Sequence, residues 1–315
     1  MSEKKKVATR DSYGQTLVEL GAENKDIVVM DADLAAATKT ALFAKAYPDR
    51  FFDAGIAEGN MAGIAAGLAA SGKIPFISSF AMFATGRAYE QIRNSIGYPQ
   101  LNVKICASHA GITVGEDGAS HQCLEDIALM RSIPGMVVMC PADDIEARAA
   151  VRAAAAYEGP VYIRLGRSAV PVINDRPDYK FEWGKGILVK EGTDVTLVAT
   201  GIMVNSAMEA AEMLEKDGIS AEIIDIHTIK PIDEEILLKS VKKTGKVITM
   251  EEHSTINGLG SAVCDVICEK YPVRVKKLGI EDIYGESGSA AALMEKYRLD
   301  GKGIYEQVKA YLAEL

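Results

Sequence analysis

Residues that can transfer protons are concentrated in one glycine-rich segment of this 315-residue sequence. Residues 108–122 hold two of the four histidines, His109 and His121, together with the adjacent acids Glu116 and Asp117. Imidazole and carboxylate side chains are common general acids and bases. Three glycines in the same segment permit the tight turns that fold a loop back over a ligand. The segment is therefore a candidate catalytic loop.

Three shorter segments also combine polar or aromatic residues: 31–39 with Asp31 and Asp33, 55–60 with Glu58, and 78–83 with Phe80 and Phe83. Each has an ordinary structural explanation as well. Aspartates suit caps and turns, a glutamate suits the start of a helix, and phenylalanines suit a core. The two histidines could be loop residues with satisfied hydrogen bonds, and Arg167 could form a surface ion pair. The residues alone leave both explanations open.

The elements that must position these segments alternate along the chain. Apolar runs of strand length lie at residues 27–31, 74–79, 103–108, 136–140 and 161–165, and segments long enough for crossover helices lie at 60–70, 86–96 and 143–157. This alternation predicts a parallel β-sheet. Because ligands bind at the carboxyl ends of parallel strands, we expect the four segments to meet at that edge.

A second domain is predicted after a segment rich in turn-forming residues. Residues 168–185 contain prolines, asparagine and aspartates without periodicity, and alternation resumes with apolar runs at 195–199, 221–225, 246–250 and 273–278. A chain of this length is also long enough for two domains. We expect an α/β protein with a first domain over 1–172, a linker over 173–190 and a smaller α/β domain over 191–315.

Composition narrows the class of protein. Apolar residues make up 48% and charged residues 25%, which indicates a folded chain, and the net charge of −9 argues against a nucleic-acid-binding role. A small anionic substrate would require a local basic pocket. No apolar run approaches the roughly 20 residues of a membrane span, and no apolar signal core follows the polar first residues. We therefore expect a cytoplasmic protein.

Taken in order, the motifs resemble those of the carboxyl-terminal half of transketolase. The matching strings are Ala-Thr-Arg10, Asp31-Ala-Asp33-Leu, Gly-Ile-Ala-Glu58, Ser-Ser-Phe80-Ala-Met-Phe83, His109, Gly115-Glu116-Asp117-Gly118-Ala-Ser-His121-Gln and Leu-Gly-Arg167. The resemblance covers nearly the whole chain. It implies a pyrimidine-binding domain of the thiamine-diphosphate enzyme type, followed by a transketolase carboxyl-terminal domain that is usually not catalytic.

The resemblance implies a cofactor role for four residues. Glu58 matches the glutamate that hydrogen-bonds the aminopyrimidine ring of thiamine diphosphate and promotes the tautomer that deprotonates the thiazolium carbon. Phe83 matches the aromatic residue stacked on the pyrimidine, Phe80 lines the same pocket, and Asp33 lies close to the cofactor. A neutral carboxyl group performs the role of Glu58 best, so apolar surroundings are expected there.

The resemblance also implies a substrate site. Arg10, His109 and Arg167 match residues that hold the sugar phosphate, where guanidinium groups can make bidentate contacts. Asp117 matches the aspartate that contacts the donor hydroxyl next to the carbonyl, and His121 a substrate-binding histidine that assists proton transfer. One position departs from the family pattern. The family usually has a serine at the phosphate site where this chain has Ala37, and Thr38 or Lys39 could replace that contact.

The activity implied is transfer of a two-carbon ketol unit from a ketose phosphate to an aldose phosphate. The sequence contains no Gly-Asp-Gly…Asn motif, which in the family binds the diphosphate through a divalent metal. A partner N-terminal subunit carrying this motif, with Mg²⁺ or Ca²⁺, is therefore expected, and α2β2 is the simplest assembly with two paired halves.

Three alternatives remain at this stage. Deoxyxylulose-phosphate synthase has a similar pyrimidine domain, but it is a single long chain and normally has arginine where His109 stands. The beta subunit of a 2-oxo-acid dehydrogenase is a separate chain of about this length, yet it usually lacks the Gly-Glu-Asp-Gly…His-Gln arrangement. A scaffold that has lost its chemistry would need none of the matching polar residues.

Overall fold

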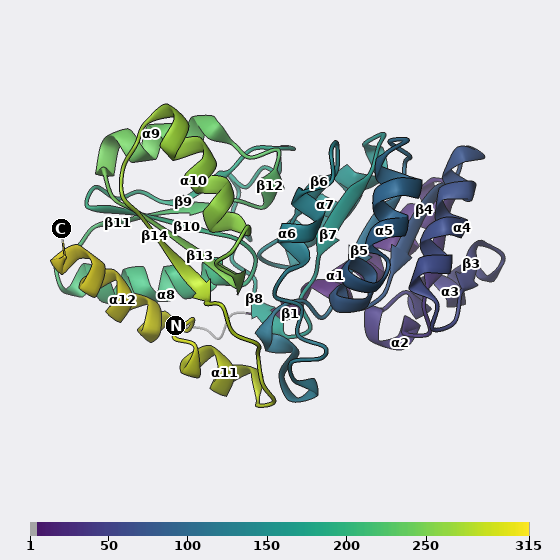
Figure 1. The fold of residues 1–315 in the computed structure, drawn as a ribbon, viewed down its shortest axis with the longest axis horizontal. Coiled ribbons are helices and arrows are strands. Elements are labelled where there is room, and N and C mark those ends of the chain that lie inside the picture. The colour runs from purple at the N-terminus through teal and green to yellow at the C-terminus, as the bar shows by residue number, and fades with distance from the viewer. Residues whose placement is uncertain (1–4, 315) are drawn as a thin grey trace.

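The computed structural model describes residues 5–314, which form two α/β units lying side by side (Figure 1). The first unit is built on a seven-stranded sheet in the order β12-β6-β7-β5-β4-β2-β3, and the second on a five-stranded sheet in the order β14-β13-β10-β11-β9. Neighbouring strands are parallel except that β12 is antiparallel to β6 and β9 to β11. The predicted α/β class with parallel sheets is confirmed.

The strands of the first sheet are β2 (Ile27–Asp31), β3 (Phe51–Asp53), β4 (Ile74–Ser78), β5 (Lys104–Ala107), β6 (Val137–Met139), β7 (Val161–Arg164) and β12 (Thr228–Lys230). Those of the second are β9 (Ile187–Lys190), β10 (Val195–Ala199), β11 (Ala221–Asp225), β13 (Val247–Ser254) and β14 (Val275–Ile280). A short pair, β1 (Lys6–Ala8) with β8 (Ala169–Pro171), forms a separate antiparallel ribbon. Every residue of β2, β10 and β11 is buried, because helices cover both faces of the sheets.

Helices sandwich the first sheet. Tyr13 and Leu17 of α1 (Thr9–Glu23) share one core with residues of α7 (Asp144–Ala156), while Met61 of α4 (Glu58–Ala70) and Ile92 share a core on the opposite face. The remaining helical segments are α2 (Ala35–Thr38), α3 (Ala41–Ala46), η1 (Pro48–Arg50), η2 (Met82–Arg87), α5 (Tyr89–Gln91), η3 (Ile92–Gly97), η4 (Ile112–Asp117) and α6 (Asp126–Arg131). These short segments carry much of the loop edge.

The second unit has the same layered plan. Helices α8 (Met203–Lys216) and α12 (Gly301–Ala313) lie on one side of its sheet, and α9 (Glu234–Thr244) and α10 (Leu259–Lys270) on the other (Figure 1). Helix α11 (Ala290–Lys296) extends toward the first unit. Asp233 and Asp300 cap α9 and α12 by accepting backbone N–H bonds, so local sequence fixes where both helices begin.

Three details differ from the sequence-based expectation. Strand β12 lies in the second half of the chain yet completes the edge of the first sheet. The last four residues of the expected linker 173–190 form β9 and belong to the second sheet. The expected crossover helix 86–96 is instead a short α-helix between two π-helical segments, η2 and η3. Non-local pairing, rather than local pattern, determines β9 and β12.

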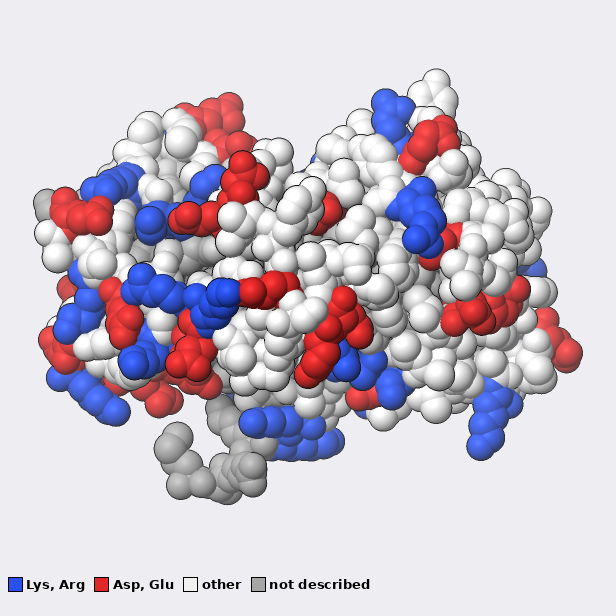
Figure 2. Space-filling view, turned by 60° about the horizontal axis from the view of Figure 1, so that its bottom comes forward, with Lys and Arg blue, Asp and Glu red and all other residues white. Residues whose placement is uncertain are grey.

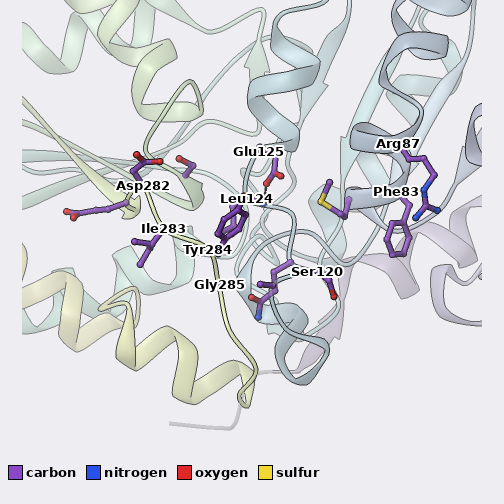
Figure 3. A pocket seen from close by; sticks show the side chains of 14 residues that line it. Phe83, Arg87, Ser120, Leu124, Glu125, Asp282, Ile283, Tyr284 and Gly285 are labelled. Atoms are coloured by element: carbon purple, nitrogen blue, oxygen red, sulfur yellow. Dashed lines mark hydrogen bonds between the residues drawn. The ribbon is translucent and has the colours of Figure 1, made fainter.

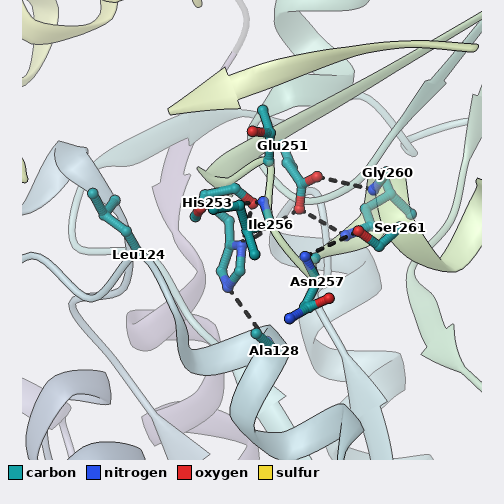
Figure 4. Close-up of polar contacts among 12 residues, drawn as sticks. Leu124, Ala128, Glu251, His253, Ile256, Asn257, Gly260 and Ser261 are labelled. Atoms are coloured by element: carbon teal, nitrogen blue, oxygen red, sulfur yellow. Dashed lines mark hydrogen bonds and ion pairs between the residues drawn. The ribbon is translucent and has the colours of Figure 1, made fainter. Parts of the chain in front are cut away.

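Buried polar contacts join the two units. Arg164 of β7 donates to Asp126 (2.8 Å) and to the carbonyl of Glu252 on β13 (2.8 Å). His253 Nε2 accepts the N–H of Ala128 at 3.4 Å (Figure 4). Because Arg164, Glu252 and His253 are buried, separating the units would break the hydrogen bonds that Arg164 and His253 make across the boundary and would leave these groups without partners there. These contacts therefore hold the two units in a fixed arrangement.

The surface shows no single dominant charge pattern on the face seen in Figure 2, where acidic and basic side chains are interspersed. Among residues 5–314, no helix is both long enough and apolar enough to cross a membrane.

Candidate active site

The four segments singled out in the sequence lie on neighbouring strands. Asp31 at the end of β2 pairs in register with Ser78 at the end of β4, and Phe80 pairs with Ser108 beyond β5. Asp31 also pairs with Asp53, which precedes the Glu58 segment. Since these strands are parallel, their carboxyl ends form one edge, as the sequence predicted.

The turn after β2 is organised by Asp31. Its buried carboxylate accepts hydrogen bonds from the backbone N–H of Leu34 (2.7 Å) and the hydroxyls of Thr38 (2.6 Å) and Thr40 (2.8 Å). Burial raises the pKa of Asp31, and these three donors oppose the rise. Asp31 thus has the structural role of a turn former. Asp33 is exposed with φ near 63°, and its backbone N–H donates to Asp53.

Aromatic rings form a continuous row along the edge. The imidazole of His109 stacks on Phe80 with ring centroids 3.8 Å apart, and Phe80 lies 6.0 Å from Phe83. His121 presents its edge to both phenylalanines, at 5.3 Å from Phe83 and 6.3 Å from Phe80. Stacking and edge-on contacts of this kind orient rings with respect to one another. The catalytic loop and the 78–83 segment are therefore packed together.

His109 is neutral in this arrangement. Its Nε2 accepts a hydrogen bond from Arg10 at 3.0 Å, so the ring proton lies on Nδ1, 2.9 Å from the Ser108 hydroxyl. Burial, followed by the positive charges of Arg10 and Arg167, lowers the pKa of His109 to about 3. Of the three residues expected to hold phosphate, only the two arginines bring positive charge.

The basic end of the row also contains the catalytic loop's acids. Arg167 contacts the carbonyl of Val114 and lies 3.2 Å from Glu116 and 4.0 Å from Asp117. Arg10 donates to the carbonyl of Ala37 at 3.0 Å, and burial together with the Arg167 charge lowers its pKa. Asp117 is exposed and available to a substrate. Arg10, His109, Asp117 and Arg167 are thus brought together as expected.

Glu58 lies at the other end of the row, at the first residue of α4, and only 1% of it is exposed. The expectation of purely apolar surroundings is wrong. Arg87 donates to both carboxylate oxygens (2.8 and 2.9 Å), and its guanidinium lies 4.7 Å from the centre of the Phe83 ring. The guanidinium group of Arg87 stabilises the carboxylate of Glu58, because burying a carboxylate without a partner is unfavourable. Sequence reasoning missed Arg87.

No local signal could have placed Arg87 beside Glu58. It is the last residue of the π-helical segment η2, which winds more residues per turn than an α-helix and so changes the face on which each residue lies. A reading based on α-helical periodicity assigns Arg87 to solvent, as an arginine in an amphipathic helix would be. Its side chain is indeed 51% exposed, but its guanidinium group pairs with the buried carboxylate of Glu58, which periodicity does not predict.

The second unit supports the catalytic loop. Glu252 accepts the backbone N–H of Thr113 at 2.6 Å, and Gly111, with φ near 79°, leaves the space that the Glu252 carboxylate fills. Gln122 donates to the carbonyl of Glu286, between β14 and α11, at 2.8 Å. Both ends of the loop are thereby fixed by residues outside the first unit.

A cavity of about 690 Å³ lies between the units next to this row (Figure 3). Phe83 and Arg87 line one side, and Ile283 and Tyr284 of the second unit line the other. The cavity is large enough for a small organic ligand. Among residues 5–314, no group of three or more His, Cys, Asp or Glu side chains is arranged to hold a metal ion.

The donor set suits one end of an aminopyrimidine. A buried carboxylate provides an acceptor or donor for a ring nitrogen, and the adjacent phenylalanine provides a flat face for stacking. The arginines at the far end of the row suit an anion such as phosphate. Fold and site together define an α/β protein whose loop edge suits a flat heterocycle at one end and an anion at the other.

Comparison with known proteins gives the family. Residues 5–172 match the model described as transketolase, pyrimidine binding domain, and residues 184–304 match that described as transketolase, C-terminal domain. A transketolase C-terminal section from Methanocaldococcus jannaschii is 52% identical over 301 residues, covering 95% of this chain and 94% of that protein. The 6-deoxy-6-sulfo-D-fructose transketolase subunit of Clostridium sp. is 46% identical, covering 94% and 91%.

A solved structure described as a split gene transketolase, inactive beta4 tetramer, superposes with a TM-score of 0.89 at 55% identity, covering 98% of this chain and 99% of that chain. The chain belongs to the transketolase family, whose members use thiamine diphosphate, and it corresponds to the C-terminal section of a split transketolase.

Proposed function

We propose that this chain is the C-terminal subunit of a two-chain transketolase that transfers a two-carbon ketol unit from a ketose phosphate to an aldose phosphate. The observation that carries the proposal is the unbroken row from Arg10 through His109, Phe80, Phe83 and Arg87 to Glu58. One end of the row suits a sugar phosphate and the other a pyrimidine. A substrate and a cofactor that react with each other must lie side by side, and this row provides that arrangement.

Glu58, Phe83 and Phe80 would hold the pyrimidine end of thiamine diphosphate. When bound, the cofactor supplies a carbon nucleophile that attacks the ketose carbonyl. Glu58 would hold a proton at a pyrimidine nitrogen, and Phe83 would fix the plane of the ring by stacking. The task of Glu58 would require Arg87 to release the carboxylate, or to share it with the pyrimidine, because Arg87 now donates to both oxygens. Asp33 would complete the edge of the cofactor site.

His121 would move a proton at a substrate hydroxyl. It lies edge-on to Phe83, and its Nδ1 is 2.9 Å from the Ser120 hydroxyl, which orients the ring. Asp117 would contact the donor hydroxyl next to the carbonyl, while Arg10 and Arg167 bind the phosphate. His109, being neutral and having both ring nitrogens paired, with Arg10 and with Ser108, would position Arg10 for the phosphate rather than contribute a charge.

A partner N-terminal subunit carrying a Gly-Asp-Gly…Asn motif would hold the diphosphate and its Mg²⁺ or Ca²⁺, in an α2β2 assembly. Two facts support a partner. The similar solved structure is described as a split gene transketolase and as an inactive beta4 tetramer. The cofactor's diphosphate also needs oxygen ligands and a cation, and the sequence lacks the Gly-Asp-Gly…Asn motif that supplies them in the family.

Coexpression with a candidate partner tests this function. The assembled protein should convert xylulose 5-phosphate and ribose 5-phosphate into a seven-carbon ketose phosphate and a three-carbon aldose phosphate, identified by mass spectrometry. Each subunit alone is the control. Product from pyruvate with glyceraldehyde 3-phosphate, without the first reaction, would instead indicate a deoxyxylulose-phosphate synthase. Absence of turnover with any pair, although the complex forms and binds cofactor, would favour a scaffold.

A further inference from the structure

The turn between β2 and α3 has no free hydroxyl to offer a ligand. Thr38 and Thr40 are buried, and both hydroxyls donate to the same oxygen of Asp31, at 2.6 and 2.8 Å. Residue 37 is alanine, and its carbonyl already accepts a hydrogen bond from Arg10. Arg10 and Arg167 form a basic site for an anion, called here the anion seat. If the turn contributes to this seat, it must do so through a side chain that carries no hydroxyl group. Of the two substitutes considered from sequence, Thr38 is excluded.

Lys39 is the residue of this turn that remains available. It ends α2 in the left-handed conformation, with φ near 73°, which a residue other than glycine rarely adopts. The conformation is held by close packing: a Cβ at Gly14 of α1 would come within 2.6 Å of the Lys39 Cβ. Backbone strain that the surroundings enforce is common at ligand sites.

The ammonium group of Lys39 belongs to the basic end of the row. It lies 3.1 Å from Asp11 in the first turn of α1, one residue after Arg10. The backbone of Lys39 lies two residues after Ala37, whose carbonyl accepts a hydrogen bond from Arg10. After burial and the charges of Arg10, Arg167 and His121, the Lys39 charge also lowers the pKa of His109, as expected of a cation at this end of the row. About a third of each side chain of the Lys39–Asp11 pair is exposed. Exposed pairs contribute little stability, so the ammonium can exchange Asp11 for another anion at small cost.

We propose that Lys39 is a further substrate-binding residue. Its ammonium group breaks the ion pair with Asp11 and contacts the terminal anionic group of the sugar, beside Arg10 and Arg167. The proposal rests on the proposed transketolase function, which supplies the substrate class. Lysine suits the task because its long, flexible stem carries a compact charge that reaches several positions of a phosphate. The family's serine hydroxyl at position 37 is neutral, whereas Lys39 adds a third positive charge to those of Arg10 and Arg167. The added charge raises the preference of the site for a doubly charged terminal group over an uncharged one.

The assembled enzyme provides the test, with hydroxypyruvate as a constant, unphosphorylated donor. Lys39→Met should raise KM for ribose 5-phosphate about tenfold more than KM for ribose, a difference equivalent to 1.4 kcal/mol. Lys39→Arg, which keeps the charge, should retain most of the preference. Asp11→Asn should act in the opposite direction and lower KM for ribose 5-phosphate, because the ammonium loses its competing anion. Lys45→Met is the matched control, since Lys45 is an exposed lysine six positions away that has no part in the seat.

Equal changes in KM for both acceptors in Lys39→Met would overturn the proposal and show a purely structural role. If the wild-type assembly transfers no ketol unit, the proposed function fails, but the role of Lys39 as an anion ligand can still be tested by a second measurement. Inorganic phosphate is then titrated into the full chain by calorimetry. Weaker binding by Lys39→Met than by Lys45→Met supports Lys39 as an anion ligand, and identical binding by the two variants rejects it.

Discussion

Replacing Glu58 by glutamine tests the cofactor end of the site. The two side chains have nearly the same shape, but an amide cannot exchange a proton with a pyrimidine nitrogen. General acid–base groups typically contribute about 10²- to 10⁴-fold to rate, so we expect Glu58→Gln to lower kcat by at least about a hundredfold. The loss should persist at saturating cofactor, because it concerns chemistry more than binding.

The structure predicts that this substitution leaves the fold intact. Glu58 loses its charge, yet Arg87 is 51% exposed and can be solvated instead. Because glutamine is neutral, the substitution leaves no unpaired charge in the buried site, so the loss of the pair is small beside a domain stability of about 5–15 kcal/mol. The glutamine oxygen still accepts one of the two hydrogen bonds that Arg87 now makes. Activity and stability should therefore separate.

The decisive assay is hydrogen–deuterium exchange at the thiazolium carbon of bound cofactor, followed by NMR, alongside steady-state turnover and circular dichroism. Arg87→Met serves as a matched control, because it breaks the same ion pair and keeps the carboxylate; we expect it to exchange faster than Glu58→Gln. Near-normal exchange and turnover in Glu58→Gln would refute the assigned role. Equal losses in the two variants would show that the ion pair matters, and not proton exchange by Glu58.

Three further outcomes follow from the geometry. Arg167→Ala should raise KM for xylulose 5-phosphate about 10- to 100-fold more than KM for hydroxypyruvate, since a charge-assisted contact is worth about 1.5–3 kcal/mol; equal increases would assign Arg167 to loop support through Val114 and Glu116. The isolated chain should bind thiamine diphosphate weakly by calorimetry with Mg²⁺ and have no transferase activity, and tight binding without a partner would contradict the divided site. Burial raises the pKa of Glu251 to about 7, above its value in the unfolded chain, so its contribution to stability is full below about pH 4 and is lost as pH rises to 7. In urea unfolding, the free energy of unfolding of Glu251→Gln relative to that of wild type should therefore rise by about 2–3 kcal/mol from pH 5 to pH 8. A constant difference between the two proteins over this range would show that the carboxyl group does not titrate with unfolding.

The edge of the first sheet was predictable because its determinants are local. Apolar runs fix the strands, and parallel pairing then places the residues that follow Asp31, Ser78 and Ala107 next to one another. No side-chain detail is needed for that step. Sequence reasoning consequently found the loops that carry Glu58 and His109 without knowing any contact between them.

Elements that depend on distant packing were missed. Helix α1 contains Gly14 and Gly21, which weaken its local helix signal. Both glycines are explained only by the folded structure: a Cβ at Gly14 would press on Lys39, and one at Gly21 on the rings of Phe43 and Tyr47. The same holds for β12, a three-residue strand whose partner lies some ninety positions earlier, at Val138 and Met139.

The second unit contributes position rather than chemistry. None of the residues in the row from Arg10 to Glu58 comes from it, yet Glu252 holds the Thr113 end of the catalytic loop and the Glu286 carbonyl accepts a hydrogen bond from Gln122 at the other end. The exposed acid Asp117 and the imidazole of His121 lie between these two supports. A loop anchored only within its own sheet would lose conformational entropy on binding substrate. Anchoring it from outside incurs that cost during folding, so the second unit stabilises the site although it contributes no residue to the row.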